Sequence, residues 1–238
     1  MYGSDAAEIY DLLHQSRGKD FEFESEVVAK LIDAHRPDAS SVLDVACGTG
    51  AHLEFFNRWY AHVEGVDASE PMLDRARVKL PGVRFAPGDM RTFSADRRFD
   101  AITCLFCSIA YLPTCEDLGT ALERFARHLT PGGVAVVEPW WFPEKFTPGH
   151  VAADVVEDGV RTVARVSHAS RTDRGNGMDV HYVIAERGAG IRHFAESHTY
   201  TPFTREQYET AFANAGFAVE FVEGAQSGRG LFVGVLER

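Results

Sequence analysis

The feature that most constrains the fold is an alternation of short apolar runs with helix-like segments between residues 41 and 139. The apolar runs lie at residues 41–46, 62–67, 83–90, 99–112 and 134–139. Each run is continuously apolar, which is typical of strands that are buried on both faces. The segment after the fourth run has helical spacing, with Thr114 as its cap, Asp117 three positions on, and Pro131-Gly132-Gly133 as its end. This alternation predicts a parallel sheet that helices cover on both faces.

The pattern changes after Pro139. Residues 151–203 show period-two alternation broken by turn clusters, which predicts three or four antiparallel strands. Residues 204–216 return to a helical pattern, with Thr204 and Gln207 as a capping box, and two strand-like runs close the chain. We therefore expect an α/β fold, in which a seven-stranded, mostly parallel, doubly wound sheet carries a small antiparallel β insertion. The expected units are residues 1–140, 141–203 and 204–238, the last completing the core sheet.

Composition argues against several classes of protein. No apolar run approaches the ~20 residues of a membrane-spanning helix, and the acidic N-terminus is unlike a signal peptide. The formal net charge of −11 argues against nucleic-acid binding. The four cysteines do not suit a secreted disulfide framework, so we expect a cytoplasmic protein with reduced thiols. Cys104 and Cys107 lack a second cysteine pair and the ten histidines show no ligand spacing, so no metal site is expected.

A glycine-rich turn follows the first apolar run. In LDVACGTG, Gly48 and Gly50 allow a tight turn and a close approach of the backbone to a ligand. Asp67 ends the second run about 20 positions later, where an acidic residue grips ribose hydroxyls. Asp89 ends the third run, where its carboxylate can accept a hydrogen bond from an adenine amino group. Position 53 is leucine, so the third glycine of a dinucleotide fingerprint is absent, and an adenosyl ligand without phosphates fits better than NAD.

These residues resemble the class I S-adenosylmethionine-dependent methyltransferases. The likeness rests on Asp44-x-x-Cys47-Gly48-Thr49-Gly50, Asp67 and Gly88-Asp89-Met90. In that family the glycine turn faces the methionine moiety, the acid after the second strand binds ribose, and the acid after the third strand reads adenine. The resemblance implies S-adenosyl-L-methionine as the cofactor, with the binding residues Tyr10, Ala46, Gly48, Gly50, Asp67, Asp89, Met90 and Phe106. A turn or helix-cap role is the alternative for each residue taken alone.

A closer resemblance covers nearly the whole chain. The TDP-amino-sugar N,N-dimethyltransferases have motifs similar to Gly18-Lys19-Asp20, LDVACGTG, GDMR, VVEPWWFPE, RVSH and SGRGLFVG. WWFPE and SGRGLFVG carry most of the specificity, because they are not part of the shared methyltransferase core. The resemblance implies dimethylation of the amino group of a TDP-linked amino-deoxyhexose in antibiotic sugar biosynthesis. Phe21 departs from the family, which has tyrosine after Gly-Lys-Asp, and this leaves the identity of the sugar open.

Two other functions remain open at this point. One is a small-molecule O- or C-methyltransferase on the same core, which the insertion and SGRGLFVG argue against. The other is a catalytically inactive nucleotide-binding module. The complete set of Gly48, Gly50, Asp67 and Asp89 argues against it, because an inactive site need not retain them.

Methylation of an amine needs a group that receives the departing proton rather than a strong base. Tyr2, Glu24 and Tyr111 are the candidates for this catalytic role. Tyr111 follows the fourth run, at the end of the sheet where such folds bind ligands. Tyr2 and Glu24 have simpler alternatives, a frayed terminus and a solvated helix charge. Positioning of the two reactants is expected to supply most of the rate.

The two phosphates of a TDP-sugar need local positive charge in an acidic protein. Arg229, between two glycines, is the first candidate, because a guanidinium pairs with phosphate oxygens in a forked geometry. The other expected substrate-binding residues are Lys19, Trp141, Ser167, His168 and Arg171. One of Trp140 and Trp141 is expected to wall the site and the other to pack in the core. We also consider a homodimer through the antiparallel insertion, since small accessory sheets expose faces that need covering.

Overall fold

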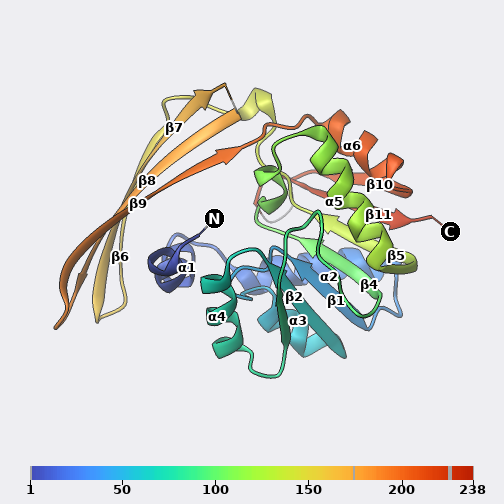
Figure 1. Cartoon of the computed structure of the whole chain (residues 1–238), viewed down its shortest axis with the longest axis horizontal. Coiled ribbons are helices and arrows are strands. Elements are labelled where there is room, and N and C mark those ends of the chain that lie inside the picture. The colour runs from blue at the N-terminus through green and yellow to red at the C-terminus, as the bar shows by residue number, and fades with distance from the viewer. Residues whose placement is uncertain (1, 174, 225–226, 238) are drawn as a thin grey trace.

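The apolar runs form a seven-stranded sheet in the order β10-β11-β5-β4-β1-β2-β3 (Figure 1). The chain is seen in a computed structural model that describes residues 2–173, 175–224 and 227–237. The strands of this sheet are β1 (Ser41–Val45), β2 (His62–Asp67), β3 (Arg84–Pro87), β4 (Phe99–Cys104), β5 (Leu129–Val137), β10 (Phe217–Val222) and β11 (Leu231–Leu236). All neighbours are parallel except at β11, which runs antiparallel to both β5 and β10. The expected seven-stranded, mostly parallel sheet is confirmed.

Helices cover both faces of this sheet. They are α1 (Ser4–Ser16), α2 (Phe21–His35), α3 (Leu53–Trp59), α4 (Glu70–Lys79), α5 (Cys115–His128) and α6 (Arg205–Asn214). Successive strand residues point to opposite faces. Val42 therefore shares one core cluster with Phe56 of α3. Its neighbour Leu43 shares another with Leu122 of α5 and Phe212 of α6. Burial on both faces explains why the strands are continuously apolar.

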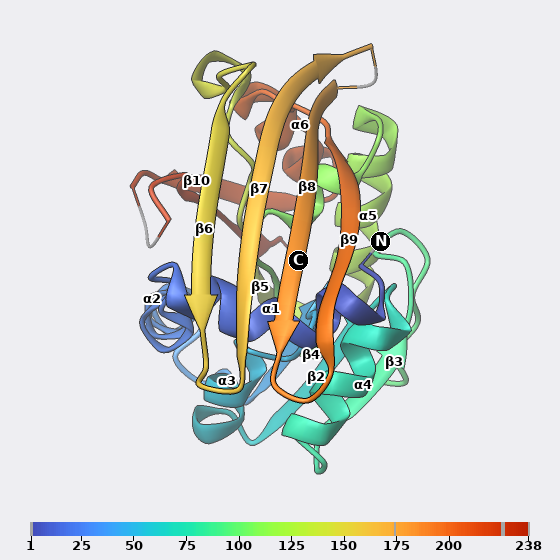
Figure 2. The ribbon, with the colours of Figure 1, turned by 90° about the vertical axis from the view of Figure 1, so that its left-hand side faces the viewer.

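The insertion is a second, four-stranded antiparallel sheet with its strands in chain order. Its strands are β6 (Val151–Glu157), β7 (Arg161–Thr172), β8 (Gly175–Glu186) and β9 (Gly190–Tyr200). Figures 1 and 2 show this long, curved sheet standing beside the core with α1 between them. Ile9 and Leu13 of α1 share an apolar cluster with Val163, Val180 and Ile184 of the insertion. Helix α1 thus joins the two sheets, while the three-unit division of the chain stays a prediction.

The fourth apolar run is not one long strand, contrary to our expectation. β4 ends at Cys104, Phe106 and Cys107 take left-handed backbone φ values of 51° and 64°, and Ser108–Tyr111 form the 3-10 helix η1. Such φ values are costly for residues with a Cβ. The fully buried Glu138 stabilises the turn by accepting a hydrogen bond from the Phe106 backbone N–H at 2.7 Å.

The glycine stretch after α5 also differs from the prediction. The helix ends at His128, and Pro131-Gly132-Gly133 lie inside β5. Leu129 already pairs with Phe99 of β4, and the register shifts between Phe99 and Ala101. The strand β5 therefore begins before the glycines, because Leu129 already pairs with β4. The glycines form an irregular part of this strand.

The predicted helix starts are confirmed. The Thr114 side chain accepts a hydrogen bond from the Asp117 backbone N–H, and Thr204 forms a capping box with Gln207. The chain also contains the short 3-10 helix η2 (Pro143–Lys145). Within residues 2–173, 175–224 and 227–237, no helix is long and apolar enough to span a membrane, and no group of three His, Cys, Asp or Glu side chains could hold a metal ion.

Candidate active site

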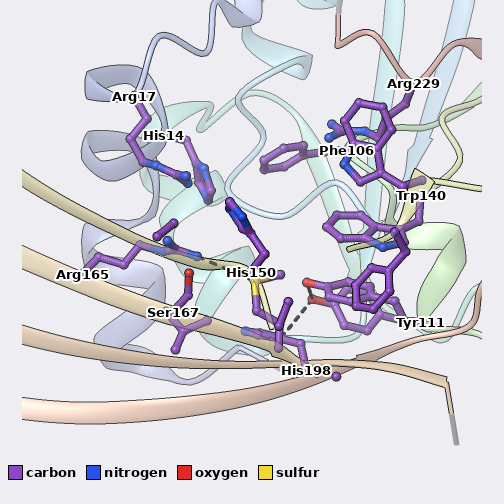
Figure 3. A pocket seen from close by; sticks show the side chains of 18 of the residues that line it. His14, Arg17, Phe106, Tyr111, Trp140, His150, Arg165, Ser167, His198 and Arg229 are labelled. Carbon is purple, nitrogen blue, oxygen red and sulfur yellow. Dashed lines mark hydrogen bonds between the residues drawn. The ribbon is translucent and has the colours of Figure 1, made fainter. Parts of the chain in front are cut away.

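A cavity of about 470 Å³ lies between the insertion sheet, α1 and the carboxyl end of the core sheet. In Figure 3, Arg165 and Ser167 of the insertion lie with Arg17, the residue after α1, at one side, and Arg229 and Trp140 lie at the other. The cations that line it are Arg17, Lys145, Arg165 and Arg229. No aspartate or glutamate lines it among the residues that the structure describes. A chain of net charge −11 therefore encloses a cationic cavity, which suits an anionic ligand.

The glycine turn adopts a backbone that leaves room for a ligand. Ala46, Gly48 and Gly50 have φ values of 60°, 55° and 71°. A Cβ at Gly48 would meet no atom within 4 Å, so the turn is open on that side. Asp67 accepts hydrogen bonds from the backbone N–H of Gly48 at 2.8 Å and of Ser69 at 2.7 Å. Burial raises the pKa of Asp67, although these bonds oppose the rise. An open turn beside an anchored carboxylate fits the ribose and methionine parts of the expected cofactor.

Tyr10 and Phe106, two of the expected cofactor-binding residues, line the cavity wall. Burial raises the pKa of Tyr10, and the nearby charge of Asp67 adds to the rise. His14 packs edge-on against Phe106 with ring centroids 4.9 Å apart. Burial, followed by the positive charge of Arg17, lowers the pKa of His14 to about 3, so this side chain is neutral in the site.

Asp89 and Met90 lie at the end of β3, and the structure gives Asp89 a close partner. Its carboxylate accepts hydrogen bonds from Arg91 at 2.6 and 2.9 Å, and Arg91 also donates to Asp117 at 2.8 Å. The bond from the Arg91 side chain lowers the pKa of Asp89. Met90 packs against the core. An adenine amino group would share this carboxylate with Arg91, and the adenine role of Asp89 stays a prediction.

Tyr2 and Tyr111, two of the three candidate catalytic residues, meet in the cavity. The Tyr111 hydroxyl lies 3.4 Å from the Tyr2 hydroxyl, 3.0 Å from that of Tyr200 and 3.0 Å from His198 Nδ1 (Figure 3). Burial raises the pKa of both Tyr2 and Tyr111. Sequence reasoning missed His198 and Tyr200. Their only signal is that they alternate along β9 with exposed residues and so share its buried face.

Glu24 is placed differently from Tyr2 and Tyr111. Its buried carboxylate accepts a hydrogen bond from Lys19 and lies 2.9 Å from His52 Nε2. Burial opposes ionisation, but the bonds from His52 and Lys19 hold the pKa of Glu24 below its ordinary value. Neither Glu24 nor Lys19 lines the cavity; the Lys19 ammonium lies 3.8 Å from the ring centroid of Phe106. Lys19 thus packs against Phe106 while it pairs with Glu24, and the substrate role of Lys19 and the catalytic role of Glu24 stay predictions.

Arg229 lines the cavity but already has an anionic partner. Its Nη2 and Nε lie 2.8 and 3.2 Å from Glu138 Oε1. Glu138 is fully buried and also holds the Phe106 turn. Arg229 is therefore not a free cation awaiting phosphate, although its Nη1 takes no part in these bonds. Trp140 and Trp141 both line the cavity, which corrects the expectation that one of them belongs to the core.

On the insertion, the structure places the three candidates differently. Ser167 faces the cavity, whereas the neighbouring His168 is exposed on the outer face. Arg171 shares the strand face of Ser167 but is exposed, lies 6.0 Å from the Phe146 ring and does not line the cavity. The substrate-binding roles of these residues stay predictions. Period-two counting from Ser167 also selects Arg165, which lines the cavity.

Arg17, Lys145 and Arg165 are the cavity cations that sequence reasoning missed. Arg17 Nε lies 2.9 Å and Arg165 Nη1 lies 3.3 Å from the same oxygen of Asp154. The Arg165 side chain is only 8% exposed. Two guanidinium groups thus share one carboxylate, which leaves positive charge for a bound anion.

Comparison with known protein families and curated relatives gives one family match and three relatives that agree with it. Residues 42–133 match a family described as a methyltransferase domain. The chain is 51% identical over 235 residues to a Streptomyces venezuelae dTDP-3-amino-3,4,6-trideoxy-alpha-D-glucopyranose N,N-dimethyltransferase, covering 99% of both chains. It is 53% identical to a Streptomyces fradiae dTDP-3-amino-3,6-dideoxy-alpha-D-glucopyranose N,N-dimethyltransferase, over 98% of this chain and 92% of the relative. A Saccharopolyspora spinosa dTDP-4-amino-2,3,4,6-tetradeoxy-D-glucose N,N-dimethyltransferase is 45% identical, over 99% and 94%.

Solved structures agree with these relatives. Streptomyces venezuelae DesVI superposes with a TM-score of 0.94 at 51% identity, covering 99% of this chain and 100% of that one. CalS10, an amino pentose methyltransferase from Micromonospora echinaspora solved with bound S-adenosylmethionine, gives a TM-score of 0.87 at 48% identity, over 95% and 96%. The likeness thus spans the core sheet, the insertion and the cavity between them.

Proposed function

Because this chain belongs to the dTDP-amino-deoxysugar N,N-dimethyltransferases, we propose how its site divides between the methyl donor and the sugar nucleotide. The enzyme uses S-adenosyl-L-methionine to add two methyl groups to the amino group of a dTDP-linked amino-deoxyhexose in antibiotic sugar biosynthesis. The division of the site follows from the two parts described above, the turn beside Asp67 and the cationic cavity.

S-adenosyl-L-methionine supplies an electrophilic methyl group on a positively charged sulfur. The open turn at residues 46–50 binds the methionine part, and the Asp67 carboxylate binds the ribose hydroxyls. Asp89 and Met90 flank the adenine. Tyr10 and Phe106 of the cavity wall lie between the methyl donor and the sugar. They position the methyl group against the amine.

Tyr2 and Tyr111 hold the amine of the sugar at this boundary. A neutral amine carries its own lone pair, so positioning it and excluding water supply most of the rate. The hydroxyl groups of Tyr2 and Tyr111 orient the amine and accept hydrogen bonds from it as charge develops on nitrogen.

Arg17 and Arg165 bind the diphosphate of the sugar nucleotide, with Ser167 as a neutral donor beside them. Their shared carboxylate, Asp154, holds both guanidinium groups in place without cancelling both charges. Guanidinium groups bind phosphate oxygens in a forked geometry, which favours arginine at this position. Arg229 has a smaller part, because Glu138 already pairs with it.

One observation carries this proposal: a cavity that four cations line is linked to Asp67 through Ser69, which donates to the Asp67 carboxylate and to the backbone carbonyl of the cavity residue Tyr2. The test is turnover of a panel of dTDP-3-amino and dTDP-4-amino deoxysugars with S-adenosylmethionine, followed by mass spectrometry. We expect a mass gain of two methyl groups on nitrogen and none on the free nucleotide. Methylation on oxygen or carbon would support the alternative transferase. Binding of adenosylhomocysteine with no methylation of any amino sugar would support the inactive module.

The protein is further proposed to form a homodimer through the outer face of the insertion sheet. Val151, Val155, Val166 and Ile191 on this sheet are between 56% and 77% exposed. Exposed apolar side chains on one sheet face favour burial against a second copy. Light scattering with Val155→Lys as the disrupting variant tests this, and a wild-type monomer at micromolar concentration would contradict it. Four unpaired cysteines support action in the reducing cytoplasm.

A further inference from the structure

The Tyr111 hydroxyl is the centre of a small network in the cavity wall. It lies 3.0 Å from His198 Nδ1, while the hydroxyls of Tyr200 and Tyr2 lie 3.0 and 3.4 Å away. His198 lines the cavity but is buried, with 6% of its surface exposed. The imidazole is therefore largely screened from bulk solvent, and its Nδ1 faces the Tyr111 hydroxyl.

A carboxylate lies on the other side of the same imidazole. Glu196 Oε2 is 3.6 Å from His198 Nε2, close enough for an ion pair but long for a hydrogen bond. Within the part of the chain that the structure describes, this oxygen is buried without a hydrogen-bond partner. The other oxygen accepts from the Gly3 backbone N–H at 3.4 Å. Because Nδ1 accepts from Tyr111, the neutral imidazole carries its proton on Nε2, which faces Glu196 Oε2. Protonation of Nδ1 turns that contact into an ion pair.

Dimethylation requires a deprotonation step between the two methyl transfers, which a single methylation does not need. The first transfer leaves a secondary ammonium ion, which has no lone pair and cannot attack a second methyl donor. A proton must leave before the second transfer. Burial raises the pKa of Tyr111 and of Tyr2. Both side chains are therefore neutral phenols, and neither is present as a phenolate base that could accept this proton.

We propose that His198, reached through the Tyr111 hydroxyl, accepts the proton that the monomethylated amine loses between the two methyl transfers. This proposal rests on the proposed function. The ammonium N–H bond breaks as its proton moves to the Tyr111 oxygen, and the Tyr111 O–H bond breaks as its own proton moves to His198 Nδ1. Tyr111 stays neutral throughout, His198 becomes an imidazolium, and Glu196 stabilises its charge. No electrons are transferred and no further reactant is required.

The charged and titratable groups around His198 come from several elements. Tyr2 belongs to the N-terminal segment, Tyr111 to η1, and Glu196 and Tyr200 to β9 itself. Met178 of β8, the cross-strand neighbour of His198, contacts Arg165 of β7, and Tyr182 lies four positions along β8. Glu196 is the only carboxylate within ion-pair distance of His198 among the described residues.

The test is the ratio of monomethylated to dimethylated product at about pH 6 and about pH 9, where the amine is mostly charged and mostly neutral. His198→Gln and Tyr111→Phe should each accumulate monomethylated sugar at the lower pH, with the second transfer slowed ~10-fold or more. Wild type should pass through to the dimethylated product at both pH values. The defect should shrink toward wild type at the higher pH, because the amine then loses its proton unaided. A purely structural defect would persist at both.

Glu196→Gln and His35→Gln complete the set. Glu196→Gln keeps the shape of the pair but removes its charge, so it should show the same pH-dependent accumulation to a smaller extent. It also covers the case in which His198→Gln does not fold. His35 lies at the exposed end of α2 beside Glu220, and its variant should behave as wild type. Wild-type product ratios in Glu196→Gln or in a folded His198→Gln at pH 6 would overturn the relay. Absence of any methylation by wild type would reject the proposed function instead, and the relay with it.

Discussion

The turn beside Asp67 and the wall of the cavity are built in opposite ways. The turn is local, since residues 46–50 and Asp67 lie at the ends of two adjacent strands and bond through backbone N–H groups. The cavity wall is assembled from distant segments, and the Tyr111 hydroxyl bonds to partners 87 and 89 positions away. A site of the first kind follows from spacing along the chain. A site of the second kind depends on where the insertion lies relative to the core.

Glu138 is the junction between these regions. It sits at the end of β5, and its carboxylate holds both the Phe106 turn and the Arg229 guanidinium. Phe106 and Arg229 both line the cavity, and Phe106 is also the residue that we propose at the boundary with the methyl donor. One buried carboxylate therefore fixes the positions of both Phe106 and Arg229.

The largest effect is expected from cutting this junction. Glu138→Ala leaves the Arg229 charge without its partner and the Phe106 turn without its acceptor. Loss of one member of a buried pair costs about 3–5 kcal/mol. We expect a loss of unfolding free energy of that size in chemical denaturation. Glu144→Ala, at an exposed position of the same WWFPE segment, is the control and should change little. A loss below ~1 kcal/mol for Glu138→Ala would show that the two regions are held together elsewhere.

Removal of the Asp67 carboxylate tests the local region by itself. Asp67→Ala should weaken binding of adenosylhomocysteine by about 1.5–3 kcal/mol, the scale of a lost hydrogen bond to a charged group. Isothermal titration calorimetry measures this directly. Asp74→Ala, at an exposed position of α4, is the matched control. Equal affinity in Asp67→Ala and wild type would remove Asp67 from the ribose site.

Removal of one guanidinium tests the assembled region. Arg165→Ala should weaken TDP binding by about 1.4 kcal/mol, or roughly tenfold, because Arg17 remains to bind phosphate. Arg171→Ala is the matched control, since Arg171 is exposed and lies outside the cavity. If Arg171→Ala weakened TDP binding and Arg165→Ala did not, the diphosphate would bind elsewhere on the insertion.

The smallest effect is expected from one hydroxyl. Tyr111→Phe should lower the rate of the first methyl transfer only modestly, below the ~10²-fold low end of general-base assistance, since positioning dominates. Single-turnover kinetics against pH measure it, with the wild-type rate rising as the amine loses its proton. A loss of ~10⁴-fold or more would make Tyr111 an essential base and contradict the positioning account.

The sequence predicted the local region well and the assembled region only in part. Continuous apolar runs gave the parallel sheet, and the spacing from Gly48 to Asp67 predicted two groups that are in fact hydrogen-bonded. The end of β4 was missed, because the left-handed turn at Phe106 depends on Glu138, some 30 positions later. No local pattern marks such a partner.

On the cavity wall, the sequence predicted only part of the lining. Ser167 lines the cavity, His168 beside it lies on the exposed face, and Arg165, which also lines the cavity, was not selected. Arg229 was predicted as a phosphate ligand from its flanking glycines, yet its charge is already paired with that of Glu138. Charge alone therefore does not identify a phosphate ligand, because the partner of each arginine is set by tertiary structure.

The claim that the two regions bind different ligands is tested most directly by crossing the ligands between variants. Asp67→Ala is titrated with TDP and Arg165→Ala with adenosylhomocysteine by calorimetry. The account predicts that each variant binds the other region's ligand within about twofold of wild type, since side chains without shared partners act independently. Loss of both ligands in both variants would show one continuous binding site and contradict the division.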